Sequence, residues 1–275
     1  MTVDLSSRVL AAAVRLLPAD RAQWGRAMVA ELSHLHGRIS RRRFVAGCLR
    51  AILLAPRGQD APGRTVVGVV AVAAIGCVGL VAYGLVHYPG LRTGPGVWVA
   101  TAAFLAAIVG YLLTAVVVIG RLTGPRRRML PLALIGGPAV TVLWLLVGIA
   151  ATSSRVSGVL PVVLIPLGSL ALGGAAAWRG RSAAEGRQVV LLAALLAGLL
   201  LFLGWVGAAV LTGGQPYDPG LVRDFHASGA PDLATYAVDD DLGTGMMLLL
   251  LVPLLTWTLG SAGASALAAA RLRGR

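Results

Sequence analysis

Long apolar runs follow one another from residue 65 onward, and all of the charges lie in the first 64 residues, in the segments between the runs and in the tail. A helix that crosses the hydrocarbon core of a bilayer needs about 20 consecutive apolar residues. Six runs meet this length and contain no Asp, Glu or Arg: 65–87, 97–120, 129–150, 156–178, 188–211 and 243–270. The pattern therefore predicts an all-α, polytopic membrane protein with a transmembrane domain of six helices over residues 65–270.

The first 64 residues show a different pattern, in which apolar residues recur at helical spacing among charged ones. This spacing predicts three short amphipathic helices, at 4–17, at 18–36 and from Ser40 onward. Ser40 belongs to the residue types that cap helix N-termini, and Gly37 is a typical helix stop. We expect a cytoplasmic three-helix region that either forms a small bundle or lies on the inner leaflet.

One apolar stripe in this region admits two interpretations. Trp24, Met28 and Leu32 recur at intervals of four residues and so share one face of the second helix. We favour packing of this stripe inside a three-helix bundle. The alternative is that the three side chains bind a partner protein.

The composition agrees with a membrane protein, because 57% of the residues are hydrophobic and only 13% are charged. All 24 basic residues are Arg, a usage typical of high-GC bacteria, and the formal net charge is +13. Twenty-one of them lie in 1–64, 121–128, 179–187 and the tail 271–275. Because cytoplasmic loops retain positive charge, we predict a multi-pass protein of the bacterial inner (cell) membrane with both termini in the cytoplasm.

Basic clusters of this kind also occur in nucleic-acid-binding proteins, but here they flank apolar runs. Arg126, Arg127 and Arg128 stand directly before the run that begins at residue 129. Anionic lipid headgroups attract basic residues at this position. We therefore expect the lipid bilayer as a partner, with headgroup contacts at these three residues, and no nucleic acid.

The N-terminal region also carries a resemblance. The residues that carry it are Leu16-Leu17-Pro18, Arg21, Trp24-Gly25, Ala27-Met28, Ala30-Glu31-Leu32, Arg43-Phe44, Gly47-Cys48 and Arg50-Ala51. This run resembles the N-terminal helical segment of uncharacterised actinobacterial multi-span membrane proteins, and it is loosely similar to HAAS-type and permease-prefix domains. Such domains precede membrane spans in proteins associated with PadR-type regulators or transport permeases. The resemblance covers about 40 residues, contains no catalytic motif and implies a regulatory or sensory role.

The apolar runs lack the residues that membrane catalysis and ion-coupled transport usually need. An ionisable side chain inside a membrane is costly and usually functional, yet none of the six runs contains Asp, Glu or Arg. The chain has neither an H-E-x-x-H pair nor a phosphate-binding loop. Cys48 and Cys77 fall in separate segments and form no metal motif. We expect no enzymatic activity, no catalytic residue, no cofactor and no metal site.

The segment 212–242 is predicted to face outward and holds six Asp against one Arg. Within it, 219–227 and 231–238 are expected to form two short helices at the interface. Asp239, Asp240 and Asp241 come directly before the last apolar run, where a cation would relieve their mutual repulsion. We favour a solvated acidic loop, and the alternative is sensing of a ligand or cation through these three residues.

The last apolar run contains small residues at every fourth position, namely Gly260, Ala264 and Ala268. Small residues at this spacing allow two membrane helices to approach closely. We therefore expect a tight helix–helix contact there.

Together these expectations favour a non-enzymatic integral membrane protein with a sensory or regulatory role. The membrane or the outer loop would act on a cytoplasmic regulatory protein through the N-terminal helices. The first alternative is the membrane subunit of a transport system whose ATPase is a separate chain, and a third interpretation is a purely structural membrane protein.

Overall fold

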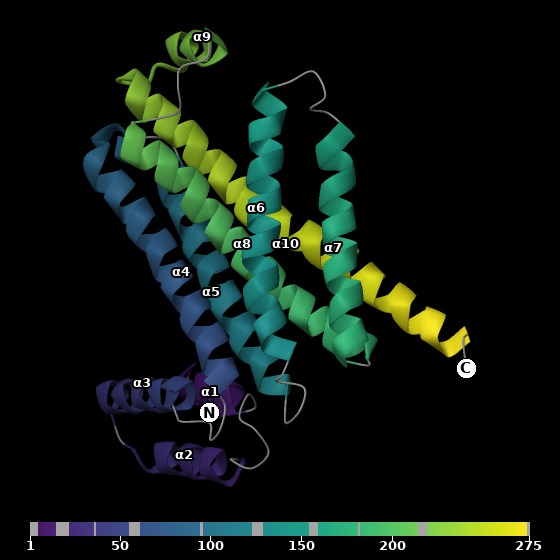
Figure 1. Cartoon of the computed structure of the whole chain (residues 1–275). Helices are drawn as coiled ribbons and strands as arrows, with labels where there is room; N and C mark the ends of the chain where they lie inside the picture. The colour runs from purple at the N-terminus through teal and green to yellow at the C-terminus, as the bar shows by residue number, and fades with distance from the viewer. Residues whose placement is uncertain are drawn as a thin grey trace. The chain divides into compact units, whose positions relative to one another are not determined.

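The computed structural model describes residues 5–14, 22–35, 37–54, 61–93, 96–122, 129–153, 159–180, 182–213 and 219–273 (Figure 1). Nearly all of these residues are helical, and no strand occurs among them. The prediction of an all-α fold is confirmed. The chain divides into two compact units, of which the first holds α1 to α3 and the second holds α4, most of α5 and α6 to α10.

The first unit is a bundle of α1 (Leu5–Val14), α2 (Ala22–His34) and α3 (Arg38–Leu54). α1 packs against both of the other helices. All three helices contribute to a cluster of buried side chains: Leu10, Ala13, Met28, Leu32, Val45 and Cys48. The region therefore has a hydrophobic core of its own, as the bundle interpretation requires.

The turn between α2 and α3 depends on Gly37. Its φ of +94° lies in the left-handed region that side chains disfavour. The expected stop at Gly37 agrees with the end of α2 at His34. The Gly37 carbonyl accepts a hydrogen bond from the Arg41 N–H at 3.1 Å. The third helix thus begins at Arg38, and the expected cap at Ser40 is wrong because Ser40 already lies in its first turn.

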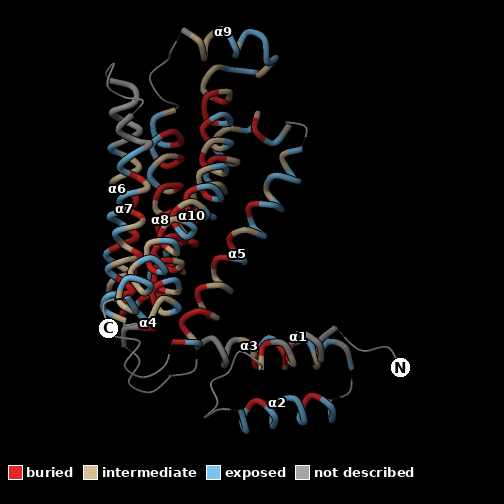
Figure 2. Tube along the Cα trace, turned by 90° about the vertical axis from the view of Figure 1, so that its right-hand side faces the viewer, coloured by how far each residue is buried: buried red, intermediate tan, exposed pale blue. Residues whose placement is uncertain are grey.

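The second unit is built around one buried helix. α8 (Ala183–Thr212) is buried over most of its length (Figure 2) and packs against α6, α7 and α10. It also contacts α4 through Cys77, whose thiol donates to the Leu199 carbonyl at 3.6 Å. The surrounding elements are α4 (Ala61–His87), η2 (Pro89–Thr93), α5 (Val97–Arg121), α6 (Leu130–Ser153), α7 (Val159–Gly180), α9 (Pro219–Ser228) and α10 (Leu233–Arg273).

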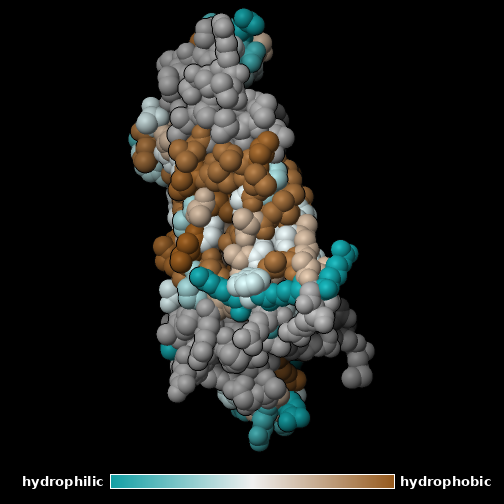
Figure 3. Space-filling model, turned by 45° about the vertical axis from the view of Figure 1, so that its right-hand side comes forward, coloured by the Kyte–Doolittle hydropathy of each residue, from teal (hydrophilic) through white to brown (hydrophobic). Residues whose placement is uncertain are grey.

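The outer faces of the surrounding helices are apolar, and Figure 3 shows this hydrophobic surface (brown) on one side. Val72, Ile75, Trp98 and Val99 are each more than two-thirds exposed. Side chains of this kind would be costly in water, whereas lipid tails match them. The chain is a multi-pass helical membrane protein.

Five described helices are long and apolar enough to cross a bilayer, namely α4, α5, α7, α8 and α10. They coincide with five of the six predicted spans. The predicted span at 129–150 corresponds to α6. The apolar part of α6 in which the side chains are described, Leu130–Leu146, is too short to be identified as a membrane span. A sixth crossing by α6 remains a prediction.

The acidic segment before the last span differs from expectation. The second short helix expected at 231–238 does not exist, because α10 begins at Leu233 and continues for 41 residues. Asp232 stabilises this start, since its carboxylate oxygens accept from the N–H and the hydroxyl of Thr235, both at 2.7 Å. The first short helix is present as α9 (Pro219–Ser228), close to its expected bounds.

α7 and α10 approach each other closely where they cross. A Cβ added at Gly173 would lie 2.6 Å from the carbonyl carbon of Gly260. A Cβ added at Gly263 would lie 2.9 Å from the Cα of Leu170. Ala264 is fully buried, whereas Ala268 is only half-buried. The expected close contact is thus present at Gly260 and Ala264, and Gly173 is its counterpart on α7.

Candidate functional site: a cavity at one end of the membrane helices

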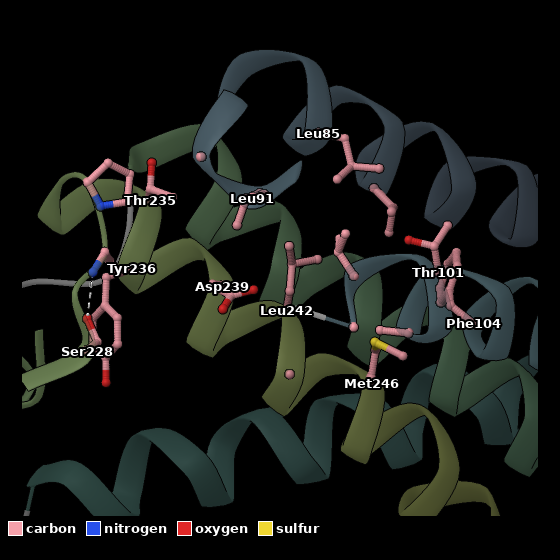
Figure 4. Close-up of a pocket in the computed structure, with 18 of the residues that line it drawn as sticks. Leu85, Leu91, Thr101, Phe104, Ser228, Thr235, Tyr236, Asp239, Leu242 and Met246 are labelled. Atoms are coloured by element: carbon pink, nitrogen blue, oxygen red, sulfur yellow. Dashed lines mark hydrogen bonds between the residues drawn. The ribbon is translucent and has the colours of Figure 1, made fainter. Parts of the chain in front are cut away.

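A cavity of about 640 Å³ lies within the second unit, where α4 ends and α5 begins (Figure 4). We call it the end cavity. Its wall consists of the last turns of α4, η2, the first turns of α5, the turn after α9 and the first turns of α10. This volume is in the range of small-molecule sites, about 300 to 1,000 Å³.

One part of the end cavity is polar. Ser228, Thr235, Tyr236 and Asp239 line it, with Asp239 placed between the other three and the apolar part (Figure 4). The Ser228 hydroxyl donates to the Phe225 carbonyl at 2.8 Å, and Thr235 donates to the Asp232 carboxylate. Both hydroxyls therefore donate to partners three residues earlier in the chain. The Asp239 carboxylate has no hydrogen bond or ion pair with any described residue and is free to meet a ligand.

The other part of the cavity is apolar. Leu85, Phe104, Leu242 and Met246 line it, together with the hydroxyl-bearing Thr101 (Figure 4). Phe104 is almost completely buried and stacks on Phe202 of α8, with ring centroids 5.2 Å apart. This part of the wall is therefore supported by the central helix.

Two short elements hold the polar part in place. η2 packs against α10 at Gly90, where an added Cβ would come within 2.7 Å of Pro231 and 2.9 Å of Thr235. α9 contacts α10 through Phe225 and Tyr236, whose ring centroids are 6.1 Å apart. The cavity wall is thus shared by segments far apart in the sequence.

The structure separates the three acidic residues that the alternative interpretation expected to sense a ligand together. Asp239 and Asp240 are both exposed on α10, but only Asp239 lines the end cavity. Asp241 is only 8% exposed and lies near Trp205 of α8. The buried indole N–H of Trp205 is close to this carboxylate but makes no hydrogen bond of normal geometry. Successive residues of a helix point about 100° apart, so the three carboxylates cannot share one ligand.

The other predicted site residues lie elsewhere. Met28 and Leu32 are 9% and 2% exposed and belong to the core of the first unit. Trp24 is 39% exposed, so the expectation that it belongs to this core is wrong, and of the three residues it is the one a partner could contact. Arg126, Arg127 and Arg128 lie outside the described residues. No cluster of potential metal ligands occurs in the described parts of the chain.

Several cavity residues were missed from the sequence. Phe104 and Thr101 come from a different span, and no local pattern connects them with α10. A signal did exist within α10, because Tyr236, Asp239 and Met246 recur at spacings of three and seven residues and so share one helix face. The sequence did not reveal this face, because Tyr236 and Asp239 were assigned to the acidic loop and Met246 to the last span.

Comparison of the chain with family models, curated proteins and solved structures found no match. The resemblance of the N-terminal residues to HAAS-type and permease-prefix domains therefore remains a prediction.

Proposed function

We propose that this protein is a non-enzymatic membrane sensor whose end cavity receives a ligand and whose N-terminal bundle passes the signal to a cytoplasmic protein. The observation that carries this proposal is that α10 forms one wall of the cavity. The same helix continues along α7 and α8. A ligand in the cavity would therefore act directly on a helix that is integral to the core of the membrane domain.

The opposite end of α10 is fastened. The Arg271 guanidinium donates to the carbonyls of Ala177 and Trp178, at 3.5 and 3.0 Å, and lies 4.2 Å from the centroid of the Trp178 ring. These contacts satisfy carbonyls at the C-terminus of α7, where a positive charge is also favourable. Movement at the cavity end of α10 would be transmitted to this anchor and to α7.

The distribution of Arg supports an orientation with both termini in the cytoplasm of a bacterial cell. In this orientation the end cavity faces outward and the three-helix bundle faces inward. Trp24, Val29 and Ile39, which are 39%, 38% and 70% exposed, are large apolar side chains of α2 and α3 that a cytoplasmic partner could bind. The resemblance to permease-prefix domains supports a regulatory protein as this partner.

The proposal can be tested by filling the cavity. Ala100 lines it, whereas Ala102, which is on the same helix and equally classed as exposed, does not. We would compare Ala100→Trp with Ala102→Trp in the full-length protein in lipid nanodiscs, and measure hydrogen exchange in α1 to α3. The cavity-filling variant should change the protection of these amides, and the matched variant should leave it at the wild-type level.

Unchanged protection in both variants would refute the sensor proposal. The transport alternative predicts a different result, namely an ATPase that copurifies with wild type and with both variants. Copurification from native membranes should therefore accompany the exchange experiment.

A further inference from the structure

We infer that the ligand of the end cavity is an amphiphile with an ammonium head group. This inference rests on the proposed function, because it names the chemical class that the same cavity would bind. The observations are the division of the cavity into a polar and an apolar part, and the single unpaired carboxylate between them.

The charge near the cavity favours a cation. Asp239 is the charged residue of the described cavity wall, and no described cation neutralises it. Residues 219–246, which comprise α9, the following turn and the start of α10, hold five Asp against Arg223 alone. The nearby Arg92 of η2 is exposed and does not line the cavity, and its Nε donates to the Leu85 carbonyl at 2.6 Å. An anionic head group would meet only repulsion at Asp239.

The shape of the cavity favours an apolar tail. From Asp239 the wall continues through Leu242 to Met246 and Phe104, side chains that a small hydrated cation would have no reason to contact (Figure 4). An ammonium group beside Asp239 would also lie near the Tyr236 ring, and aromatic faces attract such cations. A hydrocarbon tail would then replace water along the apolar wall. Together these features select an amphiphilic cation over a metal ion.

The test uses three amphiphiles that share a decyl tail: decyltrimethylammonium, decyl sulfate and decyl maltoside. Binding to the full-length protein in phosphatidylcholine nanodiscs is measured by calorimetry for wild type, Asp239→Asn and Asp240→Asn. We expect wild type to prefer the ammonium compound. Asp239→Asn should weaken its binding at least about tenfold, which corresponds to about 1.4 kcal/mol. The matched Asp240→Asn should bind like wild type, and Ala100→Trp should bind none of the three.

Two results would overturn the inference. Equal losses in Asp239→Asn and Asp240→Asn would indicate general surface attraction, and equal binding of the neutral maltoside would show that the head group is not recognised. Neither result would change the outcome of the hydrogen-exchange comparison between Ala100→Trp and Ala102→Trp. The sensor proposal is therefore tested independently of the ligand class. Nanodiscs that contain phosphatidylethanolamine distinguish two sources of the ammonium group. If this lipid competes with decyltrimethylammonium, the natural ligand is an aminophospholipid headgroup. If it does not compete, the ligand is a free amphiphile.

Discussion

The close crossing of α7 and α10 makes a sharp prediction for a single methyl group. In Gly173→Ala the new Cβ would lie 2.6 Å from the carbonyl carbon and 2.9 Å from the Cα of Gly260. Non-bonded carbons prefer a separation of about 3.5 to 4.0 Å. The carbonyl oxygen of Gly260 would be closer still to the new Cβ. The two backbones would therefore have to move apart by more than about 1 Å, and neither can rotate out of the way as a side chain would.

The neighbouring residue supplies a matched control. A Cβ added at Gly174 would have no atom within 4 Å, so Gly174→Ala makes no new contact. Both substitutions should gain helix propensity, by up to about 1 kcal/mol. The difference between them then isolates the overpacking, which typically costs about 1 to 3 kcal/mol.

Thermal unfolding of the purified protein in mild detergent provides the assay. We expect Gly173→Ala to unfold at a lower temperature than wild type, and Gly174→Ala to match or exceed wild type. Equal stability of the two variants would refute the close crossing, because it would mean that the helices are far enough apart to admit a side chain at residue 173.

Three further predictions concern other parts of the chain. In the N-terminal bundle, Leu32→Ala should cost about 2 to 5 kcal/mol because Leu32 is fully buried, and Trp24→Ala should cost clearly less. Thermal loss of helicity in α1 to α3 checks the order of the two variants, which would be reversed if Trp24 were a core residue. Asp232→Ala removes the cap of α10 and should cost about 1 kcal/mol, with faster hydrogen exchange in the first turn of α10. Hydrogen bonds from Thr235 lower the pKa of Asp232, so its contribution is present above the ordinary carboxyl pKa and is lost as the pH falls through the lowered value. The first turn of α10 should therefore lose protection in strong acid in wild type, whereas Asp232→Ala should show little further loss. Finally, a reporter fused after Arg275 should behave as cytoplasmic and one within 212–242 as external, and an external C-terminus would contradict the proposed orientation.

The membrane helices were predictable because each depends on a local property, an unbroken apolar run. α5 ends at Arg121 where the sequence predicted residue 120, and α4 ends at His87 as expected. The start of α10 was missed for a physical reason. Three consecutive Asp suggest a loop, but Asp has only a modest helix penalty, and the cap at Asp232 outweighs it.

The end cavity was harder to predict because it depends on tertiary contacts. Its lining comes from α4, η2, α5, α10 and the turn after α9, and no local pattern brings these segments together. The sequence drew attention to the acidic segment, but only one of its three neighbouring carboxylates, Asp239, lines the cavity. The direction of each side chain around the helix determines which carboxylate lines the cavity. This direction could not be derived from the sequence, because residues 233–241 were not expected to form part of one continuous helix.

The length of α10 makes the membrane domain sensitive to the thickness of the bilayer. Forty-one helical residues extend for about 60 Å, about twice the thickness of a typical hydrocarbon core. A helix this long must tilt strongly or project from the membrane, and the tilt changes when the bilayer becomes thinner or thicker. Since Arg271 ties one end of α10 to α7, a change in tilt would be expressed mainly at the other end. Membrane thickness would then set the width of the end cavity before any ligand arrives.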